Sequence, residues 1–308
     1  MIQFVSVIIC THNPRRDFFY KVIEGLKKQS LELDSWELII VDNGSKVPVQ
    51  SWVNLSWHPN ARIVNETNLG LTEARLKGIC EASCPILIFV DDDNVLRSDY
   101  LQTAIDINKK FPKVGAYSGN SIPEYEDNAS PPKGFKWPAL LALRAVDSDS
   151  VSSSYFDTGK PFGGGMVVLK SVALYYKKTI ENNKERRSLD RKGNILMSCG
   201  DTDMALCAVD LGLEFGLFQD LYLTHLIPKE RLKNEYIIKL ATNSYYSRLV
   251  LAYLRFKKIP PSPPNQIYFS LWFLYQILTK TYLERNILKA RFVARKMFFS
   301  HLGFKSNS

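Results

Sequence analysis

The chain has 308 residues, of which 45% are hydrophobic and 23% are charged. This composition excludes a disordered chain and suffices for one large globular domain or two modest ones. The net charge of +9 is unevenly spread, because residues 228–308 hold 15 Lys and Arg against three Asp and Glu. That segment therefore carries +12, and residues 1–227 carry −3.

The first 118 residues alternate apolar, β-branched runs with segments of helical spacing. Strands are predicted at 4–10, 37–41, 61–64, 86–90 and 114–118, and helices at 15–29, 71–82 and 100–110. Strands that are apolar on both faces and alternate with helices are typical of a parallel sheet covered on both sides. Crossovers in such a sheet are right-handed, so the carboxyl ends of these strands should open on one edge.

Polar loops follow four of these strands: THNP at 11–14, DNGS at 42–45, NLG at 68–70 and DDDN at 91–94. Each loop is expected at the carboxyl edge of the sheet, where open α/β folds bind their ligands. The four loops together predict one ligand-binding crevice more specifically than any one of them alone.

The middle of the chain is less regular. Residues 119–161 are rich in Pro, Ser and Asp and are predicted as a long irregular segment with one short helix near 139–145. A loop of this length is usually functional or disordered. The pattern then predicts a strand within 161–170, a charged helix at 174–187, a capped helix ending near Gly212, and one or two strands within 215–228.

The C-terminal segment is predicted as a helix over 229–257, a proline-broken hinge over 258–265 and one long helix over 266–302. Its apolar start is about a dozen residues long, too short for the ~20 that span a bilayer. Beyond it, Lys and Arg rim an apolar face, which suits a helix lying in an anionic membrane interface. The alternative is a helix packed on the α/β domain, with its cations solvated.

The five cysteines are scattered, with no CxxC pair and no zinc-type spacing: Cys10, Cys80, Cys84, Cys199 and Cys207. We interpret them as reduced core residues of a cytosol-facing protein. The opening MIQFVSVIIC lacks the basic start and small-residue cleavage site of a secretory signal. It is therefore predicted to be the first strand.

Three adjacent carboxylates, Asp91, Asp92 and Asp93, end the fourth strand. Neighbouring carboxylates raise one another's pKa values, so a cation is expected beside them. Oxygen ligands select Mg²⁺, Mn²⁺ or Ca²⁺ over zinc, and the Gly and Glu of an EF-hand loop are missing. The alternative is a solvated turn in which Asp91 or Asn94 caps the next helix.

Five segments, in this order and at these separations, resemble a family 2 glycosyltransferase with the GT-A fold: VSVIICTHNPR, ELIIVDNGS, NLGLTEARLKGI, IFVDDDN and CGDTDMAL. The resemblance covers roughly residues 4–227. It implies a Rossmann-like α/β fold whose mostly parallel sheet is covered by helices, with a nucleotide-sugar half at 1–118 and an acceptor half at 119–227. Residues 228–308 would then form a C-terminal helical extension.

The resemblance implies an inverting, metal-dependent enzyme of the hexosyltransferase type. The donor would be a nucleotide diphosphate sugar, with UDP the expected nucleotide. The acceptor would be a hydroxyl of a glycan or lipid-linked molecule in cell-surface polysaccharide synthesis. We expect the protein in the cytoplasm, peripheral on the cytoplasmic face of the membrane.

The resemblance also assigns residues to the donor site. Four of them would surround the base: Thr11, Asn13, Pro14 and Asp42. Arg75 would reach the ribose or diphosphate, and Asp91 the ribose hydroxyl. Asp93 and His225 would hold Mg²⁺ or Mn²⁺, although a lone histidine at a strand end is more often structural. The remaining members of the set are Asn68, Gly70, Asp92, Gly164 and Gly165.

Asp201 is the candidate base that takes the proton of the acceptor hydroxyl. Members of the family commonly have Glu-Asp here, and this chain has Gly200 in place of the Glu. The alternative is that Asp201 or Thr202 caps the following helix. The glycines at 163–165 allow close backbone approach to a substrate, or make a tight bend at the sheet edge.

Two other functions, one enzymatic and one of binding alone, are alternatives to glycosyl transfer. A nucleotidyltransferase predicts glycine in a basic first loop, and THNPRR has none. A non-catalytic nucleotide-sugar-binding protein is conceivable because of Gly200. Nucleic acid is not an expected partner, since the basic segment is amphipathic rather than an open basic patch.

Overall fold

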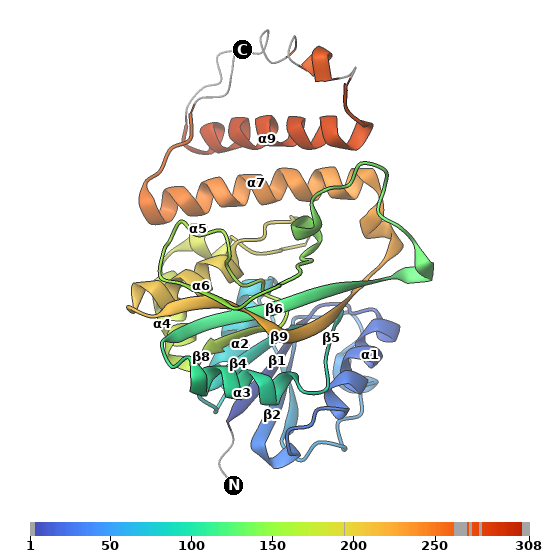
Figure 1. Cartoon of the computed structure of the whole chain (residues 1–308). Coiled ribbons are helices and arrows are strands. Elements are labelled where there is room, and N and C mark those ends of the chain that lie inside the picture. The colour runs from blue at the N-terminus through green and yellow to red at the C-terminus, as the bar shows by residue number, and fades with distance from the viewer. Residues whose placement is uncertain (1–3, 194, 262–269, 271–272, 277–278, 304–308) are drawn as a thin grey trace. The chain divides into compact units, whose positions relative to one another are not determined.

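The structure is a computed structural model that describes residues 4–193, 195–261, 270, 273–276 and 279–303 (Figure 1). The chain forms two compact units. The first comprises Met1–Glu124, Ala142–Gly193 and Gly200–Leu226, and the second Tyr125–Leu141, Asn194–Cys199 and Ile227–Ser308. The basic segment 228–308 makes up most of the second unit, whereas the division of 1–227 into donor and acceptor halves stays a prediction.

The described residues form a nine-stranded sheet with the order β3-β2-β1-β4-β8-β6-β9-β5, and β7 pairs with β9 outside this path. Its strands are β1 (Val5–Thr11), β2 (Trp36–Asp42), β3 (Ala61–Asn65), β4 (Ile86–Asp91), β5 (Asn94–Leu96), β6 (Val114–Tyr125), β7 (Ser150–Ser152), β8 (Met166–Leu169) and β9 (Glu214–Ile227). The first strand forms as predicted.

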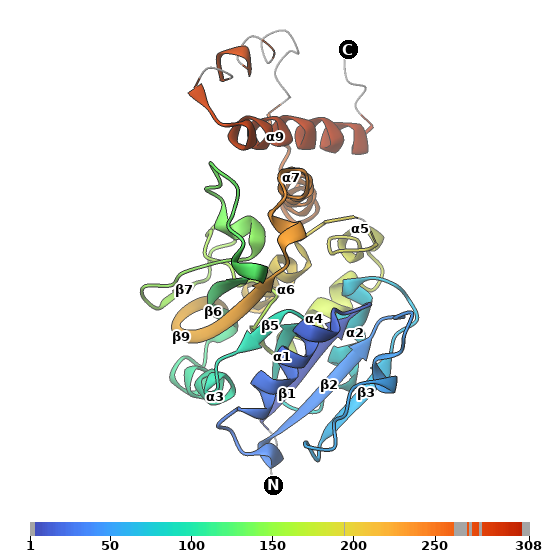
Figure 2. The ribbon, with the colours of Figure 1, turned by 90° about the vertical axis from the view of Figure 1, so that its right-hand side faces the viewer.

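The sheet is parallel at one end and antiparallel at the other. β1 pairs in parallel with β2 and β4, and β2 with β3, so these strands lie side by side (Figure 2). β8 runs antiparallel to both β4 and β6. The predicted α/β fold class is confirmed, and the antiparallel part is what strand periodicity did not reveal.

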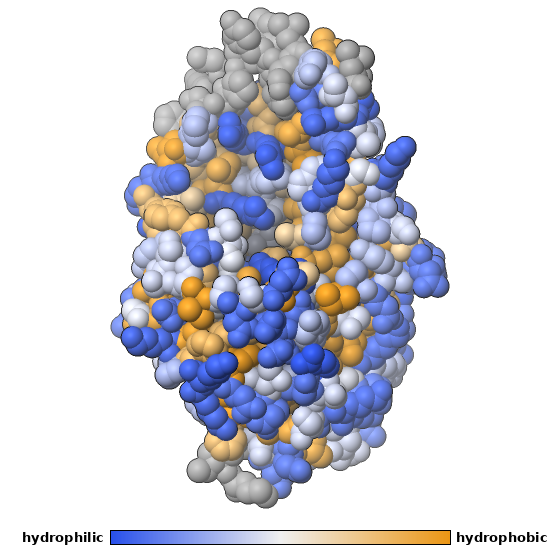
Figure 3. All heavy atoms as spheres, in the orientation of Figure 1, coloured by the Kyte–Doolittle hydropathy of each residue, from blue (hydrophilic) through white to orange (hydrophobic). Residues whose placement is uncertain are grey.

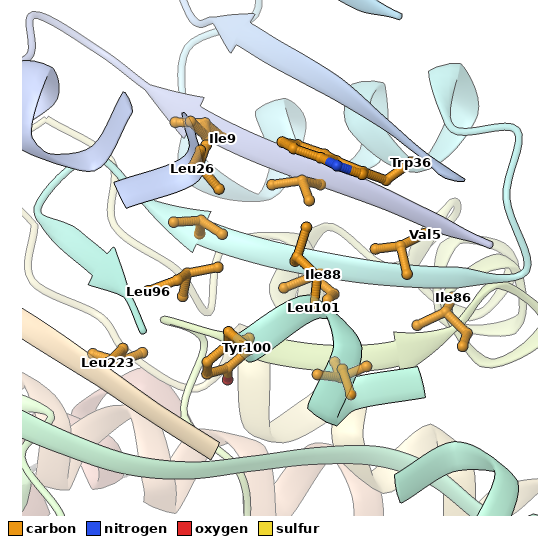
Figure 4. Packing of buried hydrophobic residues seen from close by; sticks show 14 of the residues in the cluster. Val5, Ile9, Leu26, Trp36, Ile86, Ile88, Leu96, Tyr100, Leu101 and Leu223 are labelled. Carbon is orange, nitrogen blue, oxygen red and sulfur yellow. The ribbon is translucent and has the colours of Figure 1, made fainter. Parts of the chain in front are cut away.

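Helices cover both faces of the sheet: α1 (Arg16–Lys27), α2 (Leu71–Glu81), α3 (Tyr100–Lys110), α4 (Lys170–Ile180) and α6 (Gly200–Asp210). The short helix α5 (Lys184–Arg187) follows α4. Successive side chains of β1 point to opposite faces. Val7 and Ile9 pack with α1 and α3, and Figure 4 shows Leu26 beside Ile9. Ile8 packs with α2, α4 and α6 on the other face. The fully apolar runs of the sequence are thereby explained.

The segment predicted as irregular, 119–161, begins inside a strand, because β6 continues to Tyr125. A Cβ at Gly119 would lie within 3.0 Å of the Phe218 and Leu221 carbonyl oxygens of β9. Asn120 donates from Nδ2 to the Gln219 carbonyl at 2.7 Å. Glycine and asparagine, which normally interrupt strands, are required here by the close approach of β9, and the prediction was wrong for this reason.

Other differences are smaller. The helix predicted at 174–187 is divided into α4 and α5, the short helix near 139–145 is a 3-10 turn at Pro138–Leu141, and β5 was not predicted. The helix from SCGDTDMALCAVDLGLEF is present as α6, and 215–228 forms the single strand β9.

The second unit contains α7 (Asn234–Phe256) and α9 (Tyr282–His301), which pack on each other. Thr281 begins α9 with a capping box that also uses Glu284. The single helix predicted over 266–302 is therefore wrong at its described end, because a new helix starts after Thr281. The remainder of that prediction, together with residues 262–265 of the predicted hinge, lies mostly outside the described residues.

The apolar face of α9 is covered by protein. Leu283, Ile287 and Ala290 are buried against Ile237 and Ala241 of α7. On the face seen in Figure 3, hydrophilic residues are spread over α7 and α9 with hydrophobic residues between them. Across the described ranges, no helix combines the length and apolar character needed to cross a membrane.

Candidate active site

The carboxyl ends of the parallel strands lie together at one edge of the sheet. Thr11 at the end of β1 is opposite Asp42 of β2, and Cys10 is opposite Asp91 of β4. Asn65 at the end of β3 is opposite Asp42. The convergence of these strand ends, predicted from the polar loops, is therefore confirmed.

The first and second loops are hydrogen-bonded to each other. Asn13 adopts a left-handed backbone conformation, φ 52°, and its N–H donates to Ser45 Oγ at 2.9 Å. Asp42 accepts from the backbone N–H groups of Ser45 at 2.9 Å and Val49 at 2.8 Å. Pro14 follows Asn13 and is half-buried. The carboxylate of Asp42 thus holds its own loop, whatever ligand it meets.

Asn43 joins the second loop to the third and was not singled out from the sequence. Its Nδ2 donates to the carbonyls of Glu66 at 3.0 Å and Asn68 at 2.8 Å. Its Oδ1 accepts from the N–H of Gly70 at 2.8 Å. Gly70, at φ 139°, immediately precedes α2. The VDNG turn was the available signal, but the partners of Asn43 lie 23 to 27 residues away.

The three adjacent aspartates have different partners. Asp92 accepts a short hydrogen bond from Thr11 Oγ1. Asp93 lies 3.5 Å through Oδ2 from Nε2 of His225, and its Oδ1 accepts from Asn94 Nδ2 at 3.2 Å. Asp93 and His225 lie close together because β5 pairs with β9 and places Asn94, the neighbour of Asp93, opposite His225. The structure thus brings the two predicted metal ligands together.

The carboxylates at this edge favour a cation beside them. Burial raises the pKa of the Asp91 carboxyl, and the charge of Asp93 raises it further, while Arg75, Arg191 and His225 oppose the shift. Among the described residues, no group of three or more His, Cys, Asp and Glu side chains could hold a metal ion. Mg²⁺ commonly binds one or two carboxylates and completes its shell with phosphate and water. The donor set fits Mg²⁺ or Mn²⁺ in that arrangement.

The glycine-rich segment before β8 passes close to several charged groups. A Cβ at Gly163 would collide with Nη2 of Arg75 and would lie 3.3 Å from Cβ and Oδ2 of Asp201. At Gly164, a Cβ would lie 3.1 Å from Oδ2 of Asp91 and would collide with Asn94. These glycines are therefore required by the packing of the protein itself, as the sheet-edge alternative supposed.

Gly165 has a separate reason to be glycine. Its φ of 72° lies in the left-handed region, which L side chains rarely adopt. Its carbonyl accepts a hydrogen bond of 2.5 Å from the hydroxyl of Tyr100, which comes from α3. Contacts of donor sugar or acceptor with Gly164 and Gly165 stay a prediction.

Asp201 lies in the first turn of α6, inside the helix rather than at its cap. Its Oδ2 accepts from the N–H of Gly163 at 2.8 Å, and its Oδ1 from the N–H of Thr202 at 2.6 Å. Burial raises the pKa of this carboxyl; the charge of Arg75 opposes the rise and that of Asp190 adds to it. A carboxylate held rigidly and made more basic suits proton abstraction.

Asp190 is a buried carboxylate that sequence reasoning missed. Its Oδ2 accepts from Arg75 Nη1 at 3.0 Å and from Thr72 Oγ1 at 3.1 Å. Its Oδ1 accepts from the N–H of Gly200 at 3.2 Å. Burial lowers the pKa of Arg75, but the charges of Asp190, Asp91 and Asp201 outweigh burial and raise it. No local motif marks Asp190, because its partners are distant in sequence.

Arg144 is the second missed residue near Asp201. Its guanidinium lies 3.8 Å from the centroid of the Phe162 ring. Nη1 is buried and has no hydrogen-bond partner in the part of the chain that the structure describes. Burial lowers the pKa of Arg144 to about 10, opposed by the charge of Asp201. Arg144 lies within 119–227, the predicted acceptor half.

Residues 6–147 match the model of the family described as glycosyl transferase family 2. A curated relative, the glucosyl-dolichyl phosphate glucuronosyltransferase of Haloferax volcanii, is 26% identical over 125 residues. That match covers 39% of this chain and 39% of the relative. The chain therefore aligns with about two fifths of the length of that relative.

Solved structures of S. aureus TarS resemble the whole chain. TarS 1-349 matches with a TM-score of 0.52 and 12% identity, over 99% of this chain and 93% of that one. TarS 1-349 in complex with UDP-GlcNAc matches with a TM-score of 0.52 and 14% identity over the same shares. At such identities the likeness concerns the fold, and it confirms the predicted GT-A fold. Residues 6–147 thus match the model of glycosyl transferase family 2, on a chain with the GT-A fold.

Proposed function

We propose that this protein is an inverting, metal-dependent glycosyltransferase of the hexosyltransferase type. It moves a sugar from a nucleotide diphosphate donor, a UDP-sugar, to a hydroxyl of a glycan or lipid-linked acceptor. One observation carries the proposal: a Cβ at Gly163 would lie 3.3 Å from Oδ2 of Asp201, and a Cβ at the adjacent Gly164 would lie 3.1 Å from Oδ2 of Asp91. Asp201 and Asp91 thus flank two adjacent glycines, and the donor sugar is proposed to lie between these carboxylates.

The comparisons support the donor and acceptor classes. TarS has been solved with UDP and with UDP-GlcNAc. The name of the Haloferax relative describes glucuronosyl transfer to glucosyl-dolichyl phosphate, which is a lipid-linked sugar. A UDP-sugar donor agrees with the TarS complexes, and a lipid-linked acceptor agrees with the name of the Haloferax relative. A role in cell-surface polysaccharide synthesis is part of the same proposal.

On the donor side, the first two loops would surround the base, and Asp91 would accept from the ribose. Arg75 is fixed by Asp190 with a guanidinium edge near Gly163, where it can face the diphosphate. Asp93 and His225 would hold Mg²⁺ or Mn²⁺. When bound, the cation supplies positive charge for the diphosphate as it leaves.

On the acceptor side, Asp201 accepts the proton of the attacking hydroxyl. The oxygen bonds to the anomeric carbon as the bond from that carbon to the diphosphate oxygen breaks, and attack from the opposite face inverts the configuration. The raised pKa of Asp201 makes it a stronger base than an ordinary aspartate. The positive charge of Arg75 stabilises the negative charge that develops on the diphosphate.

The exposed cations of α9 support a peripheral contact with the anionic cytoplasmic face of a membrane. Lys289, Arg291 and Lys296 are exposed, whereas Leu283, Ile287 and Ala290 of the helix pack on α7. The contact we propose is therefore electrostatic rather than an insertion of apolar side chains. Flotation with phosphatidylserine vesicles should recover the protein, and reversal of the three charges to Glu should abolish recovery. Equal recovery with phosphatidylcholine vesicles would contradict this contact.

A screen of nucleotide sugars with Mn²⁺ tests the donor. At a hundredfold excess over its dissociation constant, a bound donor stabilises the fold by about 2.7 kcal/mol. We expect thermal stabilisation and metal-dependent hydrolysis with at least one UDP-sugar, both lost in Asp93→Ala. Full activity of that variant without metal would remove the role of Asp93.

Asp201→Asn tests the base. We expect donor binding to persist while transfer falls by about 10²–10⁴-fold, the usual contribution of general base catalysis. Asp203→Asn is the matched control, because Asp203 is a buried carboxylate two residues away that pairs with Arg186 at 2.8 Å. That variant should lose stability but retain transfer. Loss of donor binding in Asp201→Asn would identify Asp201 as structural.

A further inference from the structure

The structure explains why position 200 lacks a side chain. A Cβ at Gly200 would lie within 3.0 Å of Cγ, Oδ1 and Oδ2 of Asp190, with Oδ1 at 2.6 Å. Carbon atoms do not approach a carboxyl group so closely, and the carboxyl is held by Arg75, Thr72 and the N–H of Gly200. The space beside residue 200 is therefore filled by a carboxylate from elsewhere in the chain.

We propose that Asp190 supplies the carboxylate that the chain lacks at position 200 and acts as a positioning residue for Asp201 and Arg75. The inference rests on the proposed glycosyl transfer. Asp190 binds the first N–H of α6, the helix that carries Asp201, and pairs with the guanidinium of Arg75. One buried side chain thus connects the helix of the base to the cation of the donor side.

The ion pair with Asp190 also weakens the electrostatic effect of Arg75 on Asp201. Arg75 forms its ion pair with Asp190, and both side chains are 5% exposed. The charged groups that face Asp201 are Arg75, Asp190 and Arg144. Because Asp190 engages Arg75, the attraction between Arg75 and Asp201 is partly cancelled, and Asp201 keeps its affinity for a proton.

The role of Asp190 predicts the direction in which the pKa of Asp201 changes when Asp190 loses its charge. In Asp190→Asn, Arg75 keeps its charge and loses its partner, while Asp201 loses a neighbouring negative charge. Both changes lower the pKa of Asp201, so the acid limb of the pH profile of kcat should move to lower pH by about one unit. The plateau rate should fall about tenfold, because a weaker base takes the proton less readily. The KM for the donor should rise as well, because Arg75 loses the partner that fixes it on the donor side.

Transfer of the carboxylate from position 190 to position 200 tests the geometry. Gly200→Ala alone should lower the thermal midpoint and the activity, because its Cβ collides with Asp190. In Asp190→Ala/Gly200→Ala the collision is gone, but Arg75 is left buried without its anion, so both stability and kcat should stay low. In Asp190→Ala/Gly200→Glu, a carboxylate is again present, and kcat should exceed that of the double alanine variant by about tenfold.

The outcomes separate the inference from the function on which it rests. An unchanged kcat and pH profile in Asp190→Asn, with an active wild-type protein, would overturn the role of Asp190 alone. Equal kcat values in the two double variants would also overturn it. A wild-type chain that neither hydrolyses nor transfers any nucleotide sugar would contradict the proposed function and, with it, this role of Asp190.

Discussion

Two arginines face Asp201 from different parts of the α/β unit, and their surroundings differ. Arg75, in α2, pairs with Asp190, and the nearby carboxylates raise its pKa in spite of burial. Arg144, between the 3-10 turn and β7, stacks on Phe162, and burial lowers its pKa to about 10. The charge of Arg75 is thus neutralised by a carboxylate of the fold, whereas the charge of Arg144 is partly buried at a cost in stability.

The difference teaches how the site divides its tasks. A buried cation that is paired and hydrogen-bonded belongs to the folded structure. A cation with a buried N–H that lacks a hydrogen-bond partner costs stability, and such costs are retained at functional sites. We therefore expect Arg75 to be needed for both folding and transfer, and Arg144 to be needed for transfer at the expense of stability.

The largest effect on stability is expected for Arg75→Met. This change leaves Asp190 buried without its cation, which typically lowers the free energy of unfolding by about 3–5 kcal/mol. Urea unfolding would measure the loss. Arg75→Lys is the control: it keeps the positive charge beside Asp190 but not the guanidinium N–H that bonds Oδ2, so its loss should be smaller. A stability equal to that of the wild type in Arg75→Met would show that Asp190 does not depend on this pair.

Glu37→Gln probes a buried ionic network at the other end of β2. Glu37 accepts from Ser6 at 2.6 Å, Ser83 at 2.7 Å and Arg62 at 2.7 Å. Burial would raise the pKa of Glu37, but these hydrogen bonds lower it from 4.5 to about 2. We expect Glu37→Gln to lower the free energy of unfolding by about 2–3 kcal/mol at pH 7, with transfer unaffected.

The pH dependence of that effect has a clear sign. The folded pKa lies below the unfolded value, so the contribution of Glu37 is complete above pH 4.5 and is lost as the pH falls toward 2. The difference in stability between wild type and Glu37→Gln should therefore shrink between pH 5 and pH 3 in urea titrations. A constant difference over this range would contradict the role of the charge.

The smallest effect, and of opposite sign, is expected for Arg144→Met. The change removes a buried N–H without a partner but keeps apolar bulk against Phe162. The free energy of unfolding should rise by about 1 kcal/mol, while transfer should fall. Arg144→Lys should keep part of the transfer activity. A less stable Arg144→Met would mean that the stacking on Phe162 outweighs the cost of burial.

Sequence reasoning located the parts of the site that depend on local order. Asp91, Asp93 and Asp42 stand at the ends of apolar runs, so periodicity alone placed them on one edge. Asp190 could not be found in this way, because its bond to Arg75 spans 115 residues. Asn43 and Arg144 were missed for the same reason: hydrogen bonds to distant residues and stacking on Phe162 determine their surroundings. The irregular composition around Gly119 concealed a strand, because glycine and asparagine are needed there only to fit the backbone of β9, which is distant in sequence.

The C-terminal helix illustrates a different limit. Its apolar stripe was read as a membrane-binding face, and in the structure Leu283 and Ile287 pack on α7 instead. An apolar stripe shows that a helix must bury one side, but periodicity does not identify the partner. The cations beside the stripe are what still supports the membrane contact.

The path of the chain limits how this protein can be dissected. It passes between the two compact units five times, because 125–141 and 194–199 belong with the C-terminal helices. A gene fragment that stops after residue 227 would still encode Phe135, Trp137 and Leu140, whose apolar partners in α7 and α9 would be gone. Such a fragment should aggregate rather than fold. An exchange of the C-terminal unit with a relative must therefore carry three segments, and insertions or deletions near 125 or 199 would disturb both units at once.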